Sequence, residues 1–317
     1  MKRGLSRFLI ASAIVLAGVV VVDVCVGLMM DRFLPKIGNS GDTGRTYFSM
    51  YQVEEPVLIV GSSRASHHYV PQIISDSLGM PVRNIGRDGC FFSYNCCVIN
   101  SILDRYSPKL IIWENGSDYL SEEVRDPLEN LYPYYVSNSH VHSCIKSYMS
   151  LLDRIPLYSS MYRYNSVIHR ILMRYASGGE DDDSLMGYLP LKPKEWNAPA
   201  RKSDSEKEYH ISKTKEQQFI SVLERVKTQG VRMVVVDSPI YTKSEQKTES
   251  CKRMREICDS LDVLFLDNSG LEGFSGNKEL FNDGTHMNEI GAEDYTQYLI
   301  EQCRSNGILD DINEINQ

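Results

Sequence analysis

Five short, mostly apolar runs, joined by segments of helical pattern, constrain the fold of this chain more than any other feature. The runs are PVLIV, PVRNI, PKLIIWE, VRMVVVD and DVLFLD. The helical pattern before the fourth run is typical, with Phe219, Leu223 and Val226 on one stripe and Gly230 closing it. Apolar strands that alternate with helices indicate a parallel sheet covered on both faces. The sequence therefore predicts an α/β fold, a three-layer α/β/α sandwich with a mostly parallel five-stranded sheet, whose ligands bind beyond the carboxyl ends of the strands.

An apolar stretch over residues 8–30 precedes these runs, and as a helix it is long enough to cross a hydrocarbon core of roughly 30 Å. Its one charged residue, Asp23, is interpreted as a tolerated polar residue away from the centre of the span. Lys2, Arg3 and Arg7 lie ahead of the stretch, which places the N-terminus in the cytoplasm by the positive-inside rule.

A cleaved signal peptide is the alternative interpretation of this stretch. Its apolar region would be shorter, and no small-x-small cleavage site follows the run. We therefore expect an uncleaved single-pass membrane anchor with the catalytic domain outside the cytoplasm, in a bacterial periplasm.

The chain is expected to fall into five segments. They are a cytoplasmic tip and transmembrane anchor (1–37), a linker (38–55), the α/β domain (56–120 and 213–305), a helical cap-like insertion (121–212) and a tail (306–317). The insertion is rich in Tyr and Arg, and two interpretations stay open for it: a cap or partner-binding wall above the sheet, or a set of packed surface helices.

Composition excludes some classes of function. A net charge of −8 and a pI near 5.5, without a cluster of Lys and Arg, argue against nucleic-acid binding. The eight cysteines have no zinc-ligand spacing, and with Cys25 in the apolar stretch an odd number remains, so a complete set of disulfides is not expected. Buried free thiols are the expectation, and no metal or other cofactor is predicted.

Near the end of the chain, the stretch FNDGTHMNEIG holds an Asp and a His three residues apart. Asn-Asp-Gly is typical of a turn, so Asp283 and His286 are expected on a loop. A His acts as a general base when a carboxylate fixes its tautomer and a hydroxyl lies within hydrogen-bond reach. Ser63, directly after the first strand in GSSR, can supply that hydroxyl at the carboxyl edge of the sheet, although a helix cap is the structural alternative.

Four blocks, IVGSSR, RNIGRDG, ENGSD and DGTH, stand in that order after the first three strands and before the last helix. Together they resemble the SGNH, or GDSL-like, hydrolases over roughly residues 57–120 and 215–303. The resemblance implies a flavodoxin-like fold in which Ser63 is the nucleophile, His286 the general base and Asp283 its orienting carboxylate.

The same resemblance implies an oxyanion hole formed by the amides of Ser63 and Gly89 and by one side chain of the third block. That block departs from the family pattern, because Ser117 stands where the family has Asn. Asn115, two residues earlier, is the alternative donor. Losing one such donor typically costs about 100- to 1,000-fold in rate, so the departure matters.

Three further residues are candidates for substrate binding, with ordinary packing as the alternative for each: Arg64, His68 and Tyr241. A Ser-His-Asp site predicts a serine esterase. The expected topology, together with the substrates that the family resemblance implies, suggests O-acyl esters as substrates, in particular O-acetyl esters of a cell-surface glycan. Two alternatives stay open. One is an O-acyltransferase of surface polysaccharide, served by a membrane partner that delivers acyl groups. The other is a non-catalytic glycan-binding or assembly protein that keeps a degenerate SGNH fold.

Overall fold

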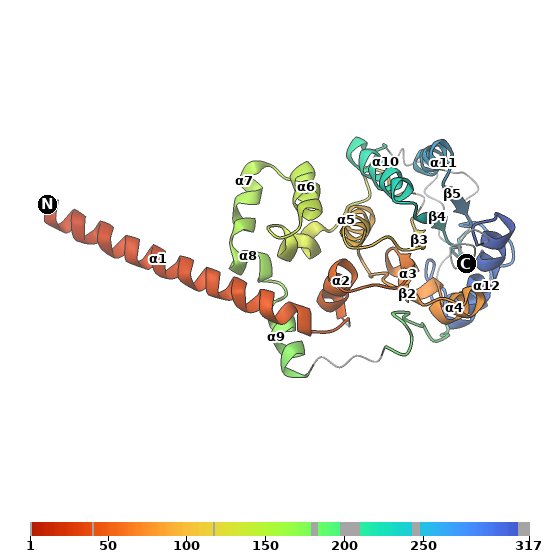
Figure 1. Ribbon diagram of the computed structural model, residues 1–317, viewed down its shortest axis with the longest axis horizontal. Helices are drawn as coiled ribbons and strands as arrows, with labels where there is room; N and C mark the ends of the chain where they lie inside the picture. The colour runs from red at the N-terminus through yellow and green to blue at the C-terminus, as the bar shows by residue number, and fades with distance from the viewer. Residues whose placement is uncertain are drawn as a thin grey trace. The chain divides into compact units, whose positions relative to one another are not determined.

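Five parallel strands form a single sheet in the order β2-β1-β3-β4-β5 (Figure 1). The structure is a computed structural model that describes residues 2–39, 41–116, 118–178, 183–196, 210–242 and 248–309. The strands are β1 (Val57–Val60), β2 (Val82–Asn84), β3 (Leu110–Glu114), β4 (Arg232–Asp237) and β5 (Leu264–Asp267). This is the flavodoxin-like strand order, in which the chain leaves β1 and β3 in opposite directions and opens a crevice between their carboxyl ends.

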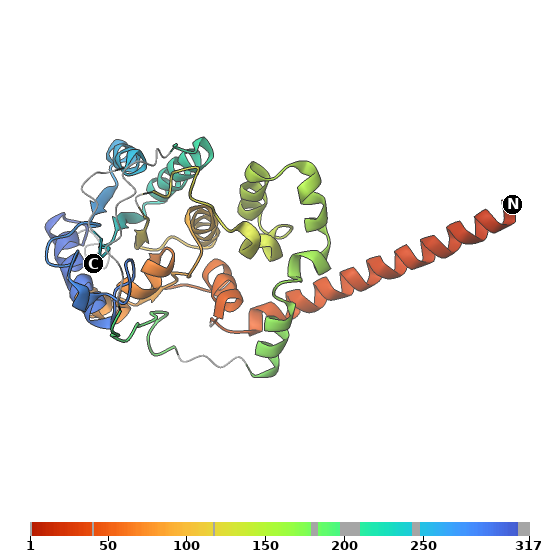
Figure 2. The same cartoon turned by 180° about the vertical axis from the view of Figure 1, so that it is seen from behind.

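Helices cover both faces of the sheet (Figures 1 and 2). One layer consists of α3 (Ser63–His68), α4 (Pro71–Leu78) and α12 (Glu289–Ser305), and the other of α5 (Phe92–Leu103), α10 (Lys213–Thr228) and α11 (Glu249–Leu261). The predicted three-layer α/β/α fold class is therefore confirmed.

Alternate strand residues pack against each layer, because successive side chains of a strand point to opposite faces. Ile59 and Ile112 join the core beneath α3, α4 and α12. Trp113, the next residue of β3, lies on the other face between Phe92 of α5 and Phe219 of α10, with ring centroids 5.6 and 5.5 Å away. Both faces of the sheet are therefore dry, which explains why most of its strand residues are apolar.

The chain divides into two compact units. Residues 48–128 and 182–317 form the first, called the α/β unit below, and residues 1–47 and 129–181 form the second, called the helical unit. Two boundaries differ from the expected segments. Gly41–Tyr51 forms helix α2 in the stretch predicted as a linker. The polar composition of this stretch gave no sign of the helix, although its Met50 is fully buried.

Residues 183–196, expected in the insertion, belong to the α/β unit. They bond to its backbone: the amide of Asn84 donates to Met186, and the amide of Leu189 donates to Ser66, each at 2.9 Å. A short turn of helix, η4 (Lys278–Leu280), precedes the Asp283–His286 loop. Residues 310–317 of the predicted tail lie outside the described residues.

The helical unit begins with α1 (Lys2–Phe33), a helix long and apolar enough to cross a membrane, and its most apolar stretch is not buried. An anchor and a signal sequence both satisfy this test. The expected insertion covered residues 121–212. The other elements of the helical unit are short helices: η1 (Leu34–Lys36), η2 (Leu128–Tyr134), α6 (Ser139–Tyr148), α7 (Leu151–Arg154), η3 (Ile155–Tyr158), α8 (Ser160–Tyr164) and α9 (Ile168–Ala176).

The interpretation of Asp23 as a merely tolerated residue is wrong. Its carboxylate accepts hydrogen bonds from the Ser159 hydroxyl at 2.6 Å and from the amides of Ser160 and Met161 at 3.0 and 2.8 Å. These amides belong to the first turn of α8, where a helix leaves its N–H groups without intrahelical partners. Asp23 therefore ties α1 to the insertion.

Candidate active site

The turn that follows β1 places Ser63 at the carboxyl edge of the sheet, beside the crevice between β1 and β3. Ser62 is the N-cap of α3 by position, but its side chain does not cap the helix and is 2.9 Å from the Tyr119 hydroxyl. The Ser63 hydroxyl is also free of a capping role. It lies 2.7 Å from Nε2 of His286, a residue 223 positions later in the chain.

His286 is held by Asp283 on the loop before α12. Nδ1 of the ring is 2.9 Å from Oδ2 and 3.1 Å from Oδ1 of Asp283. An ionised carboxylate only accepts hydrogen bonds, so Nδ1 carries the proton and Nε2 is left to accept from Ser63. The structure thus brings Ser63, His286 and Asp283 together in the order that the sequence predicted.

Backbone groups of the same turn fix the Asp283 carboxylate. The amides of Thr285 and His286 donate to Oδ1 at 2.8 and 2.9 Å, and the Thr285 hydroxyl donates at 3.1 Å. Burial alone would raise the pKa of Asp283, but the hydrogen bonds from His286 and Thr285 outweigh it and lower this pKa to about 2. Asp283 therefore stays ionised over the whole physiological range. Sequence analysis missed Thr285, although its place between the two predicted residues was a usable signal.

The triad lies at the surface of the unit. The side chain of His286 is 26% exposed and that of Asp283 is 49% exposed, and Ser63 is partly exposed. Water can therefore reach the serine and the imidazole.

Arg64 lies beneath the triad in a buried ionic network, which corrects its prediction as a substrate-binding residue. Its guanidinium bonds to Glu114 at 2.7 Å, to Asp237 at 2.8 Å and to the carbonyl of Ser238 at 3.1 Å, and the side chain is only 10% exposed. Burial raises the pKa of Asp237 to about 7, even though Arg64 opposes the shift. Arg64 therefore connects α3 to the ends of β3 and β4, and it is not available to substrate.

His68 is corrected in the same way. It is fully buried, its Nε2 accepts a hydrogen bond from the amide of Met287 at 3.0 Å, and its Nδ1 therefore donates to the Ser238 hydroxyl at 2.8 Å. Burial keeps its pKa well below the usual value, so the ring is neutral. Because Met287 directly follows His286, His68 holds the catalytic loop against α3.

Tyr241 lies beside the same loop. Its amide donates to the carbonyl of Gly284 at 3.2 Å, and its half-buried ring makes edge contacts with Trp196 and Phe281. A contact between Tyr241 and substrate stays a prediction.

The candidate oxyanion donors have different outcomes. Gly89 is exposed and left-handed (φ 68°) in a turn closed by the amide of Cys90 and the carbonyl of Arg87, a conformation that favours glycine. Asn115 is fully buried, and its Nδ2 contacts the sulfur of Met254 on α11 at 3.5 Å.

The prediction of Asn115 as an oxyanion donor is therefore wrong. The chain continues the strand pairing of β3 through the Asn115 amide, so the pleat turns this side chain toward the α11 layer. Ser117, the other candidate, lies outside the described residues.

A second histidine, His67, lies close to the triad, and the sequence patterns did not single it out. The His67 ring lies 5.6 Å from the His286 ring, centroid to centroid. Its Nδ1 contacts the carbonyl of Leu189 at 2.6 Å and its Nε2 contacts Asp88 at 3.1 Å. The partners come from distant parts of the chain, so spacing gave no signal for them.

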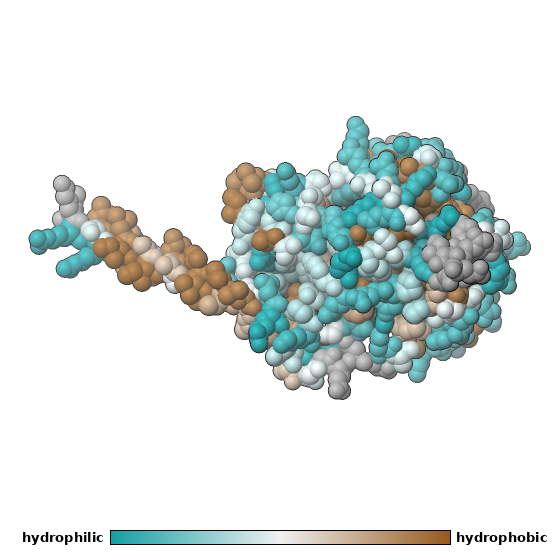
Figure 3. All heavy atoms as spheres, viewed as in Figure 1, coloured by the Kyte–Doolittle hydropathy of each residue, from teal (hydrophilic) through white to brown (hydrophobic). Residues whose placement is uncertain are grey.

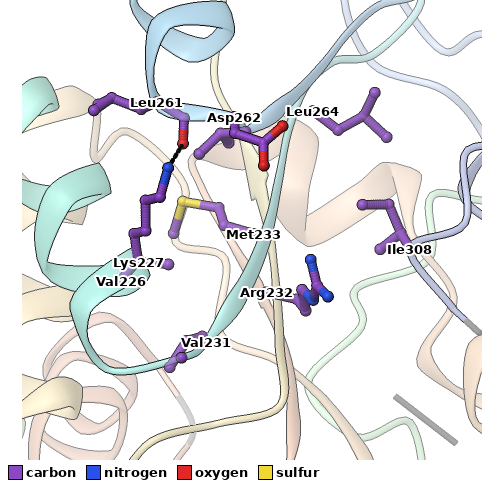
Figure 4. Close-up of a pocket in the computed structure, with 11 residues that line it drawn as sticks. Val226, Lys227, Val231, Arg232, Met233, Leu261, Asp262, Leu264 and Ile308 are labelled. Atoms are coloured by element: carbon purple, nitrogen blue, oxygen red, sulfur yellow. Dashed lines mark hydrogen bonds between the residues drawn. The ribbon is translucent and has the colours of Figure 1, made fainter. Parts of the chain in front are cut away.

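A cavity of about 290 Å³ lies at the opposite edge of the sheet (Figure 4). Its walls include Val231 and Arg232 at the start of β4 and Leu264 at the start of β5. It is therefore separate from the triad, which lies at the carboxyl ends. Over the described ranges, no three His, Cys, Asp or Glu side chains are grouped so as to hold a metal ion.

No family model and no curated protein matches the chain. Similar solved structures include the crystal structure of TesA (TM-score 0.41, 12% identity, 78% of this chain and 98% of that chain covered). Another is a Bacteroides fragilis protein provisionally named an acylhydrolase (TM-score 0.40, 12% identity, 84% and 96% covered). At this identity the likeness concerns the fold alone, and the chemistry depends on the residues of this chain.

Proposed function

We propose that this chain is a membrane-anchored serine esterase of the SGNH type, with Ser63 as nucleophile, His286 as general base and acid, and Asp283 as the orienting carboxylate. The continuous hydrogen-bond path from Ser63 through His286 to Asp283, at 2.7 and 2.9 Å, carries this proposal. A serine hydroxyl is a weak nucleophile at neutral pH, and an imidazole within hydrogen-bond distance can remove its proton as attack begins.

The reaction would proceed through an acyl-enzyme. The Ser63 oxygen attacks the ester carbonyl while His286 takes the hydroxyl proton, and His286 then returns that proton to the departing alcohol. Water, deprotonated by His286, attacks the acyl-serine and releases the carboxylic acid. We place the developing oxyanion at the amides of Ser63 and Gly89. The Ser63 amide belongs to the first turn of α3, where N–H groups have no intrahelical acceptor.

The structure of α1 supports an uncleaved anchor. Its last turns are built into the helical unit: Met30 is fully buried, and the Phe33 ring stacks on Tyr175 at 4.2 Å. Cleavage after the apolar stretch would remove these contacts and the Asp23 contacts. An anchor with the α/β unit outside the cytoplasm makes O-acetyl esters of a cell-surface glycan the proposed substrates.

The exposure of the triad favours hydrolysis over transfer, because water can reach the acyl-serine. Transfer to a polysaccharide hydroxyl is the second candidate function, and it uses the same three residues. The two differ in whether an acceptor sugar takes up the acyl group that would otherwise appear as acetate.

The test uses the full chain in detergent with a short-chain p-nitrophenyl ester. We expect Ser63→Ala to lower kcat by more than about 1,000-fold, since removing a triad nucleophile typically removes nearly all triad catalysis. Ser66→Ala is the matched control, because it also deletes a hydroxyl from α3. That hydroxyl donates to the carbonyl of Ser62 and not to His286. A fluorophosphonate probe should label the parent at Ser63 alone.

Undiminished labelling or hydrolysis in Ser63→Ala would refute Ser63 as the nucleophile. A parent protein that neither hydrolyses the ester nor reacts with the probe would refute the enzymatic proposal and favour a non-catalytic glycan-binding protein. Acetate release from an acetylated glycan, measured with and without an acceptor sugar, then distinguishes the two reactions. Acetate that falls as acetylated acceptor rises would identify a transferase.

A further inference from the structure

The helical unit exposes several large apolar side chains along α7, η3 and α8. These six residues, called the apolar stripe below, are Leu151 (67% exposed), Leu152 (75%), Ile155 (56%), Tyr158 (59%), Met161 (49%) and Tyr162 (42%). Single exposed apolar residues are ordinary, but six within twelve positions form a patch of the kind that marks an interaction surface.

The stripe does not result from poor packing of these helices. Leu157 is fully buried and Tyr164 is 2% exposed, so the inner side of the same segment has its own core. The segment is thus apolar on two sides, one packed within the unit and one open. Figure 3 shows hydrophobic side chains along α1 and again on the part of the unit where Figure 1 places α7.

Three residues of α1, four apart, attach α8 to this helix. Asp23 binds the first turn of α8, and Asp31 accepts a hydrogen bond from the Tyr164 hydroxyl at 2.9 Å. Between them Gly27 lets α8 approach closely, since a Cβ there would lie 2.5 Å from the Ser160 hydroxyl oxygen. Residues four apart share one face of a helix. The height of the stripe along α1 is therefore set between residues 23 and 31.

That height lies near the outer edge of the hydrocarbon core of a bilayer crossed by α1, roughly 8 Å inside it. The apolar stretch before Asp23, from Phe8 to Val22, is about 22 Å long at about 1.5 Å per residue. A hydrocarbon core is about 30 Å thick, so Asp23 and α8 would lie close to its outer boundary. The stripe would then be level with the lipid head groups and the first part of the acyl chains.

The residue types fit this depth. Leu151, Leu152 and Ile155 are suited to acyl chains, and Tyr158 and Tyr162 to the head-group region where tyrosine is enriched. Lys146 lies in the last turn of α6, before the apolar residues, and Arg154 lies among them beside the acidic Asp153. Apolar residues with neighbouring Tyr, Lys and Arg are typical of helices that lie in a membrane interface.

We propose that α7, η3 and α8 rest on the outer leaflet of the membrane that α1 crosses, with the apolar stripe in contact with lipid. This inference rests on the proposed anchor. It assigns the insertion a lipid surface as partner. A bound protein in place of lipid is the competing occupant.

The test uses the full chain reconstituted in phosphatidylcholine vesicles whose acyl chains carry bromine, which quenches tryptophan fluorescence on contact. One variant is Leu152→Trp in the stripe. Leu16→Trp in α1 (65% exposed) reports insertion of the anchor, and Ile290→Trp on α12 (49% exposed) is a matched exposed apolar position in the α/β unit. Each is compared with the parent, which contributes Trp113 and Trp196.

We expect the added signal to fall about twofold or more at Leu16 and Leu152 and to stay unchanged at Ile290. Quenching at Leu16 without quenching at Leu152 would overturn the inference, leave the anchor standing and point to a protein occupant of the stripe. No quenching at Leu16 would remove the anchor and the inference together. Equal quenching at Ile290 would indicate general adsorption and also overturn it.

Ester hydrolysis by the same vesicles is independent of these outcomes. A quenched stripe on a protein without Ser63-dependent hydrolysis would refute the proposed enzyme and leave the membrane contact intact.

Discussion

Replacing Arg64 with Met should destabilise the α/β unit strongly, because it leaves two buried carboxyl groups without their counter-ion. The side chains of Arg64, Glu114 and Asp237 are 10%, 1% and 2% exposed. Removing one member of a buried ion pair typically costs about 3–5 kcal/mol. For a unit of this size, each kcal/mol corresponds to roughly 2–4 °C in Tm, so we expect a decrease on the order of 10 °C.

The penalty should also depend on pH. Burial raises the pKa of Asp237 to about 7 in the folded state. Protonation of Asp237 therefore stabilises the folded state fully at pH values below the ordinary pKa of Asp, and this stabilisation is lost as the pH rises through 7. Arg64 opposes that rise of the pKa. Without it the folded unit prefers neutral Asp237 still more, and the cost of Arg64→Met should therefore be smaller at pH 5 than at pH 8.

Tryptophan fluorescence during urea or thermal unfolding is a suitable assay, because Trp113 and Trp196 both belong to the α/β unit. Lys252→Met is the control: its ion pair with Glu249 is in the same unit, and the two side chains are 56% and 68% exposed. Such exposed pairs contribute little to stability, because solvent screens them. The reasoning about the buried network fails if Arg64→Met costs no more than Lys252→Met, or if its penalty does not increase with pH.

Three further substitutions test the site. Asn115→Ala should leave kcat within a few-fold of the parent, because the side chain faces Met254; a 100-fold loss would restore Asn115 as an oxyanion donor. Asp283→Asn should lower kcat by roughly 10,000-fold with little change in KM, and because the pKa of Asp283 is about 2, a titration step of the parent's kcat near pH 4 would contradict the assignment. Gly89→Ala should cost about 1 kcal/mol of stability by Trp fluorescence and Gly89→Asn less; equal costs would contradict the left-handed turn.

The family resemblance and local patterns were enough to predict the fold class and to select Ser63, Asp283 and His286, whose side chains lie within hydrogen-bond distance of one another in the structure. The strands and helices follow from apolar runs and from spacing within a dozen residues, and the Asp283–His286 turn is encoded by its own Asn-Asp-Gly. Ser63 was predicted from its place after the first strand. None of these inferences needs to know which distant residue becomes a neighbour.

The direction and partners of individual side chains could not be predicted in this way. Asn115 faces α11 because the pairing of β3 continues by one residue, and Arg64 is committed to Glu114 and Asp237, which come from later strands. Asp23 looked tolerated because its acceptor role depends on α8, more than a hundred residues away. Which elements form, and which chemical groups they carry, can be read from local pattern because both depend on neighbouring residues. Which groups meet follows from the folded molecule, because burial and pairing depend on elements that are distant in the chain.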